Sequence, residues 1–183
     1  CMKRIVAAPT AGACGVVPAV YLTLQEQRQI DDERMLEAMY IASGVGGVIA
    51  NRAFLAGAAG GCQAEIGSAS SMAAAGAVYL AGGDTEAIIH AAAMAMKNLL
   101  GLARDPVAGL VEVPCVKRNV VGAVNALSAA DMALAGVRSI IPPDEVFDAM
   151  RSVGISLPEA IRETGKGGDR KSTRLNSSHS EIS

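Results

Sequence analysis

The stretch IGSASSMAAAGAVYLAGG, residues 66–83, carries no charged side chain across its eighteen positions. Most of its residues are Ala, Gly or Ser, and such small side chains let neighbouring backbones approach closely. Eighteen residues is near the lower limit for crossing a bilayer, but a run of small and hydroxyl-bearing residues is only weakly hydrophobic. The stretch therefore predicts a helix buried inside a helical protein rather than a membrane span.

Helix signals continue on both sides of this stretch. The central helix is expected over 70–80, and Gly82–Gly83 ends it. Asp84 is placed to cap the next helix, which ends near Gly101. An earlier helix should start at Asp31–Asp32 and run toward Gly44, where glycines 44, 46 and 47 predict a break or a close helix crossing. Later helices are expected over 119–135, from Pro143 to about Gly154, and over 157–164.

The composition is typical of an all-α fold, mostly helical with little strand. The 183 residues include no Trp, 2 Phe and 3 Tyr, although 51% of the chain is hydrophobic. Ile5–Val6 and Leu110–Val113 are the only short strand candidates. The length suffices for one domain with a sizeable core. A net charge of −2 without a block of either sign argues against nucleic-acid or polybasic membrane binding.

Both ends of the chain differ from the rest. Cys1 precedes Met2, and the polar, Ser-rich segment at the end lacks a helical apolar stripe. We expect one domain over 1–168 and a non-native or disordered tail over 169–183. His179 lies in that tail, so His90 is the one remaining histidine, and its Ala-rich helix favours a core or interface role over catalysis.

Pro9 and Gly12 interrupt any apolar run near the start, which argues against a secretory signal and predicts a cytoplasmic protein with reduced cysteines. Three segments combine Gly or Pro with candidate ligands: APTAGACG at 8–15, GGCQAEIG at 60–67, and the segment from Asp105 to Cys115. Glycine lets a backbone approach a ligand and proline stiffens a loop. These segments fit either a preorganised site or ordinary tight turns. Neither a CxxC pair nor a P-loop occurs, so a zinc-ribbon or nucleotide site is not indicated.

Longer stretches resemble the alpha chain of the iron-sulfur L-serine dehydratases. The resemblance is carried by VAAPTAGACGVVPAV (6–20), GCQAEIGSASSMAAAG (61–76), NLLGLARDPVAGLVEVPCVKRN (98–119), AADMALAGV (129–137) and SLPEAIRETGKGG (156–168). It covers nearly everything from Ile5 to Gly168. It implies an L-serine ammonia-lyase, which converts L-serine to pyruvate and ammonia, with a beta subunit or domain as partner and an oligomeric assembly.

The resemblance also implies a [4Fe-4S] cluster on three cysteines. Cys62 matches the first ligand and Cys115 the third, while Thr10 and Gly12 would line the substrate pocket. Arg104 stands where the second cysteine is expected, and its guanidinium has no lone pair for iron. Arg104 is then a sequence error, the mark of an inactive chain kept for assembly, or a change compensated by Cys14.

Two rival functions have weaker support. A pyridoxal-phosphate dehydratase needs a Schiff-base lysine beside a phosphate cradle, and none of the five lysines lies in such a motif. A helical membrane protein would rest on residues 66–83 alone.

Overall fold

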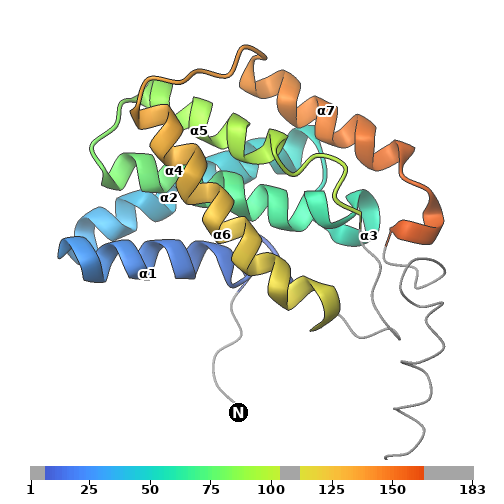
Figure 1. The fold of residues 1–183 in the computed structure, drawn as a ribbon, viewed down its shortest axis with the longest axis horizontal. Coiled ribbons are helices and arrows are strands. Elements are labelled where there is room, and N and C mark those ends of the chain that lie inside the picture. Colours follow the sequence, from blue (N-terminus) through green and yellow to red (C-terminus); the bar gives the residue numbers. More distant parts are fainter. Residues whose placement is uncertain (1–6, 104–111, 163–183) are drawn as a thin grey trace, which may run out of the picture.

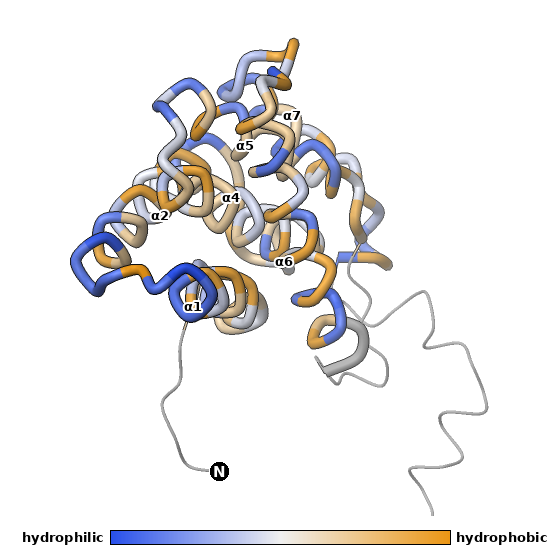
Figure 2. The backbone as a smooth tube through the Cα atoms, turned by 60° about the vertical axis from the view of Figure 1, so that its left-hand side comes forward, coloured by the Kyte–Doolittle hydropathy of each residue, from blue (hydrophilic) through white to orange (hydrophobic). Residues whose placement is uncertain are grey.

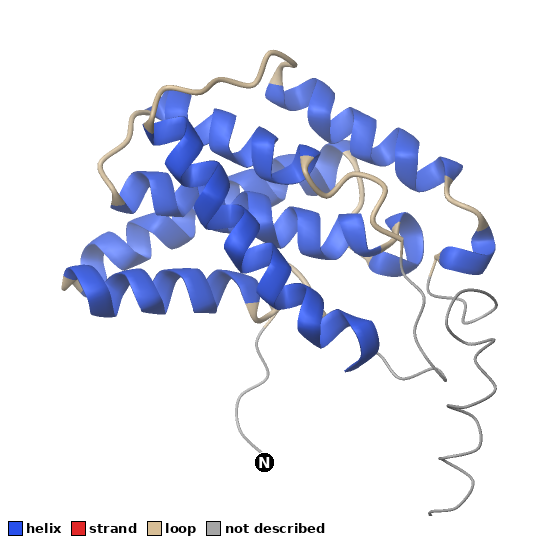
Figure 3. Ribbon diagram, in the orientation of Figure 1, coloured by secondary structure: helices blue, strands red, loops and turns tan. Residues whose placement is uncertain are grey.

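The computed structural model describes residues 7–103 and 112–162, and this part of the chain consists of helices without a strand (Figure 3). The prediction of an all-α fold is confirmed. In chain order the elements are α1 (Val16–Arg28), α2 (Asp32–Arg52), α3 (Gly57–Gly60), the π-helix η1 (Gln63–Gly67), α4 (Ser68–Leu80), α5 (Thr85–Lys97), α6 (Glu112–Leu134), α7 (Pro143–Ser156) and the 3₁₀ turn η2 (Glu159–Ile161).

Helix α4 is the centre of the fold, and Figure 1 shows α1, α2, α5 and α6 arranged around it. Every residue of α4 except Tyr79 is buried. The buried helix predicted from residues 66–83 is therefore confirmed. None of the helices in 7–103 and 112–162 is long and apolar enough to cross a membrane.

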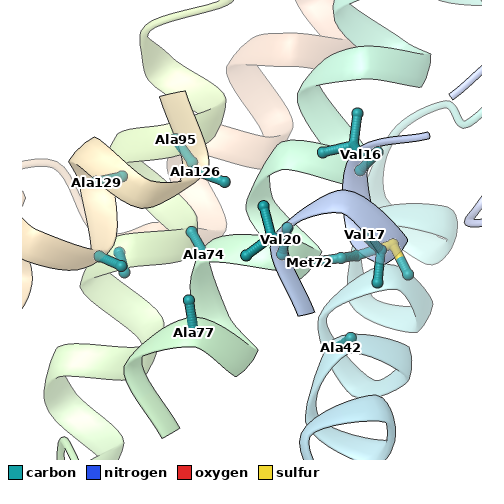
Figure 4. Packing of buried hydrophobic residues seen from close by; sticks show 14 of the residues in the cluster. Val16, Val17, Val20, Ala42, Met72, Ala74, Ala77, Ala95, Ala126 and Ala129 are labelled. Carbon is teal, nitrogen blue, oxygen red and sulfur yellow. The ribbon is translucent and has the colours of Figure 1, made fainter. Parts of the chain in front are cut away.

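Small residues set the spacing between these helices. Figure 4 shows alanines of α4, α5 and α6 meeting across the core, while valines of α1 pack beside Met72. A Cβ at Gly76 would collide with the Tyr21 hydroxyl, which donates a hydrogen bond to the Met72 carbonyl at 3.0 Å. Burial raises the pKa of the Tyr21 phenol above its usual value. Glycine at position 76 thus lets α1 lie directly on α4.

Caps confirm several predicted boundaries. The Asp84 carboxylate accepts a hydrogen bond from the Ala87 amide at 2.7 Å, and Asp31 does the same for Arg34 at 2.9 Å. Gly101 and Gly136, which follow α5 and α6, have φ values of +83° and +89°. Both adopt the left-handed conformation that glycine permits at low cost.

Other boundaries differ from the predictions. Helix α1 was not predicted, although Val16, Val20 and Leu24 mark its buried face. Helix α2 does not break at its glycines. Of the two predicted possibilities, the structure shows a close helix crossing, which lies at Gly46: a Cβ there would lie 3.0 Å from the sulfur of Met72 in α4. Gly44 and Gly47 face open space.

Helix α6 begins at Glu112 rather than Asn119, because Pro114 falls in its first turn, where a missing N–H costs nothing. The strand candidate over 110–113 is wrong for Glu112 and Val113; its first half and the candidate at 5–6 lie outside the described residues. Helix α7 extends past Gly154 to Ser156. The helix expected over 157–164 is a single 3₁₀ turn, and its last two residues also lie outside.

Candidate functional site

The structure brings the two predicted cluster cysteines together. Cys62 lies between α3 and η1, and Cys115 lies in the first half of α6. Both are buried, with 0% and 2% exposure, and their sulfur atoms are 3.9 Å apart. A disulfide needs about 2.05 Å, so the two residues are neighbouring thiols rather than a covalent pair.

Cys115 affects the protonation of Cys62. The pKa of the Cys62 thiol is raised well above its usual range, first by the contact with Cys115 and then by burial, while the positive charge of Arg118 opposes the shift. Arg118 is fixed by a hydrogen bond from its guanidinium to the Ala103 carbonyl. The Cys62 thiol of the metal-free protein is therefore held protonated at neutral pH beside a fixed cation.

The turn that carries Cys62 is built by Gly61 and Gln63. Gly61 has φ +77°, and a Cβ there would lie 3.0 Å from the Leu102 carbonyl oxygen. The fully buried Gln63 side chain donates to the Met150 carbonyl at 3.1 Å and accepts from the Gly101 amide at 2.9 Å. Gln63 therefore ties the cysteine turn to α7 and to the loop after α5.

A π-helix follows Cys62 directly, and such segments occur frequently at functional sites. It carries Glu65, whose side chain is buried at 7% exposure. The Glu65 carboxylate packs against the backbone of Gly12, so that a Cβ at Gly12 would lie 2.7 Å from Oε2. The predicted substrate loop thus touches the segment that carries the first cysteine.

Asn119 joins the same loop to the second cysteine. Its Nδ2 donates to the carbonyls of Gly12 and Cys115, both at 2.9 Å, and its Oδ1 accepts from the Gly15 amide at 3.0 Å. Asn119 was not among the site residues predicted from the sequence. The available signal was its place four residues after Cys115, one helical turn along the same face.

The other predicted residues are placed as follows. Thr10 lies in the loop before α1, and its Oγ1 is buried with no hydrogen-bond partner among the described residues. His90 is structural: its Nδ1 accepts from the Ser139 amide at 3.2 Å. Cys14 is half-buried, and the described residues contain no group of three or more His, Cys, Asp or Glu able to hold a metal. Arg104 lies outside the described residues.

These observations allow a test of how the site fits an iron-sulfur cluster. Thiolates are the ligands that such clusters use, and Cys62 and Cys115 supply two of them from a buried position. The described residues supply no third ligand beside them, and the compensation by Cys14 gains no support. The pair could therefore serve as two of the three ligands that the resemblance implies, and the remaining ligand position is the one where Arg104 stands in the sequence.

The fold and the site define a class of protein: an all-helical domain that packs two buried thiols against a Pro- and Gly-containing loop. The sequence comparisons specify the family. The family model described as "Serine dehydratase alpha chain" matches residues 1–168. The chain belongs to this family, and the resemblance stated from its sequence is confirmed.

Individual relatives of the chain also carry L-serine dehydratase names. The chain is 57% identical over 167 residues to the "Probable L-serine dehydratase, alpha chain" of Latilactobacillus sakei, covering 91% of this chain and 80% of that one. It is 51% identical to the "L-serine dehydratase, alpha chain" of Peptoniphilus asaccharolyticus, covering 91% and 57%. It is 42% identical to the "L-serine dehydratase TdcG" of Escherichia coli, covering 90% and 37%. The chain thus spans between about a third and four fifths of these relatives.

Proposed function

We propose that this chain is the alpha chain of an L-serine ammonia-lyase, which converts L-serine to pyruvate and ammonia. The observation that carries the proposal is the convergence of Cys62, Cys115 and the loop of Thr10 and Gly12 in a member of the serine dehydratase family. The reaction removes the α-proton and hydroxide from serine, and the resulting aminoacrylate becomes an imine that water hydrolyses.

In this proposal Cys62 and Cys115 hold two corners of a [4Fe-4S] cluster. The cluster, when bound, would supply a Lewis acid that makes hydroxide a better leaving group. Gln63 and Asn119 fix the backbone around the two ligands, the role that outer hydrogen bonds play at metal sites. The cytoplasm, which keeps thiols reduced, is the compartment in which the pair persists.

The loop before α1 would bind the substrate. The Thr10 hydroxyl is buried and unpartnered among the described residues, so it can donate to a carboxylate of the substrate without losing a bond inside the protein. Glycine at position 12 allows the loop to lie against Glu65. A beta chain completes the enzyme, as the alpha-chain names of the relatives suggest.

One specific observation favours a second function. Because Arg104 occupies the position of the remaining cluster ligand, the chain would be an alpha chain kept for assembly without catalysis. This alternative predicts a folded, colourless protein that still binds its partner chain.

Activity in a longer relative tests the lyase proposal. The matching segment of the Peptoniphilus asaccharolyticus alpha chain is replaced with residues 1–168 of this chain, the part that the family model matches, with and without Arg104→Cys. Pyruvate formation is then measured anaerobically with the partner chain. We expect the Arg104→Cys chimera to produce pyruvate and the chimera with Arg104 to be at least about 100-fold slower, since a lost ligand costs as much or more. An Arg104→Cys chimera that holds iron but forms no pyruvate would contradict the lyase proposal.

A further inference from the structure

The outward face of α6 is more hydrophobic than a solvent-facing helix needs to be. Val116, Val120 and Val124 are exposed at 62%, 65% and 59%. The inward face of the same helix is made of smaller residues, namely Gly122 and the alanines at 126, 129, 130 and 133. The larger aliphatic side chains therefore face solvent while the small ones face the core, which indicates that something covers the outer face.

Figure 1 shows that α6 crosses over α4 on the outside of the bundle. Hydrophobic residues recur along the α6 tube in Figure 2. Val121, Leu127 and Leu134 are also exposed, at 51%, 36% and 40%. We call the six residues Val116, Val120, Val121, Val124, Leu127 and Leu134 the α6 stripe.

Two charged residues lie along this stripe at equal distances from Val124. Lys117, Val124 and Asp131 are spaced by seven residues, so they follow one line along the helix with a drift of only about 20° per step. All three are exposed. Neither charged residue forms an ion pair with another described residue. A positive residue, Lys117, and a negative residue, Asp131, therefore lie at equal distances on either side of the apolar Val124.

We infer that a second copy of this chain covers the α6 stripe, with the two α6 helices antiparallel about a two-fold axis at Val124. In that arrangement each residue on this line faces the residue equally far beyond Val124 in the other copy. Lys117 then faces Asp131 of the second copy, twice. A parallel pair would place Lys117 against Lys117 and Asp131 against Asp131, so the charges select the antiparallel form.

The first test is cysteine cross-linking at two positions of the stripe. In the antiparallel dimer the two Val124 residues meet at the axis, whereas the two Val116 residues are about 24 Å apart along it, at 1.5 Å per residue. A disulfide needs Cα atoms within about 7 Å. Mild oxidation should convert Val124→Cys to a disulfide dimer on a non-reducing gel and leave Val116→Cys and the parent chain monomeric. Cross-linking of Val116→Cys as efficiently as Val124→Cys would overturn the antiparallel arrangement.

The second test measures the association itself by sedimentation equilibrium of the 183-residue chain. We expect the parent chain to be a dimer at about 100 µM. The dissociation constant of Val124→Asp should be at least about tenfold higher. Because Val124 is exposed, this variant should keep the circular dichroism spectrum of the parent. Lys117→Asp alone and Asp131→Lys alone should each raise the constant about fivefold by two like-charge contacts. The double variant Lys117→Asp/Asp131→Lys exchanges the charges and should return to the parent value.

A parent chain that stays monomeric at about 500 µM would overturn the inference. The stripe would then belong to a different partner chain. A double charge exchange that remains as weak as the single variants would also overturn it, because only the two-fold arrangement brings these two residues together.

Discussion

At the scale of single residues, the fold places the sulfur atoms of Cys62 and Cys115 3.9 Å apart, although the two residues are fifty-three positions apart in the sequence. Residue spacing alone did not predict this pair, because no short cysteine motif marks it. The resemblance to a family predicted it, through the segments around Cys62 and Cys115. The surrounding contacts of Asn119 and Arg118 could not be predicted, because they depend on how α6 packs against the loop before α1 and against the segment after α5.

The raised pKa of Cys62 predicts how stability changes with pH in the metal-free chain. The unfolded thiol ionises near pH 8.5, whereas the folded thiol keeps its proton. The stabilisation is therefore fully present below about pH 8.5 and is lost as pH rises further, because the unfolded state gains by ionising. Between pH 8.5 and 9.5 the free energy of unfolding should fall by about 1 kcal/mol more in the parent than in Cys62→Ala.

Urea denaturation of both proteins at each pH measures this difference. The comparison with Cys62→Ala removes the contribution of the ionising groups outside the Cys62–Cys115 contact, which the two proteins share. Identical pH dependence in the two would show that Cys62 ionises as easily in the folded chain as in the unfolded one.

Thr10 predicts opposite effects on stability and on substrate binding. Its buried Oγ1 has no partner among the described residues, so Thr10→Val should leave the metal-free chain as stable as the parent or more stable, by up to about 1 kcal/mol. The same change in the active chimera should raise KM for L-serine roughly tenfold, because a hydrogen bond to a charged group is lost. Thr10→Ser keeps the hydroxyl and is the matched control.

Thermal unfolding and steady-state kinetics give the two readouts. An unchanged KM in Thr10→Val would remove Thr10 from the substrate pocket, while a large loss of stability would show that its hydroxyl is needed by the fold.

At the scale of elements, the sequence predicted the helices with strong local signals. Asp84 capped α5 and the uncharged run formed α4, as expected. Helix α1 was missed because Pro18 and the glycines at 12 and 15 indicate a loop, and only its packing against α4 reveals the buried face of Val16, Val20 and Leu24. The π-helix was not predictable, since it follows from tertiary contacts of Gln63 rather than from a local propensity.

Glycines of α4 and α2 predict opposite responses to the same substitution. Gly76→Ala forces a Cβ into the Tyr21 hydroxyl and should destabilise the chain by about 1–3 kcal/mol through overpacking. Gly44→Ala adds a Cβ into open space in the middle of α2 and should stabilise it by about 0.5–1 kcal/mol.

Urea midpoints of the two variants measured side by side check this pair. If both substitutions changed the free energy of unfolding equally and with the same sign, the close packing of α1 on α4 at Gly76 would be contradicted.

At the scale of the whole molecule, composition was sufficient to predict an all-α fold. A chain with few aromatic residues and many alanines is expected to form helices that pack at close range. Helices α1, α2, α5 and α6 pack around α4 in this way (Figure 1). Composition could not predict which helix would carry large residues outward. The large exposed side chains of α6 follow from which of its faces packs on the core, and that depends on the tertiary structure.

The central proposal is that Cys62 and Cys115 are two of three ligands of an iron-sulfur cluster and that Arg104 stands at the position of the remaining ligand. The most direct measurement is the iron and sulfide content after anaerobic reconstitution of the chain as written, of Arg104→Cys, and of Arg104→Cys combined with Cys62→Ser. Arg104→Cys should hold about four irons and four sulfides per chain, and the other two proteins only a small fraction of that. A full cluster in the chain as written, or one that survives Cys62→Ser, would contradict the account.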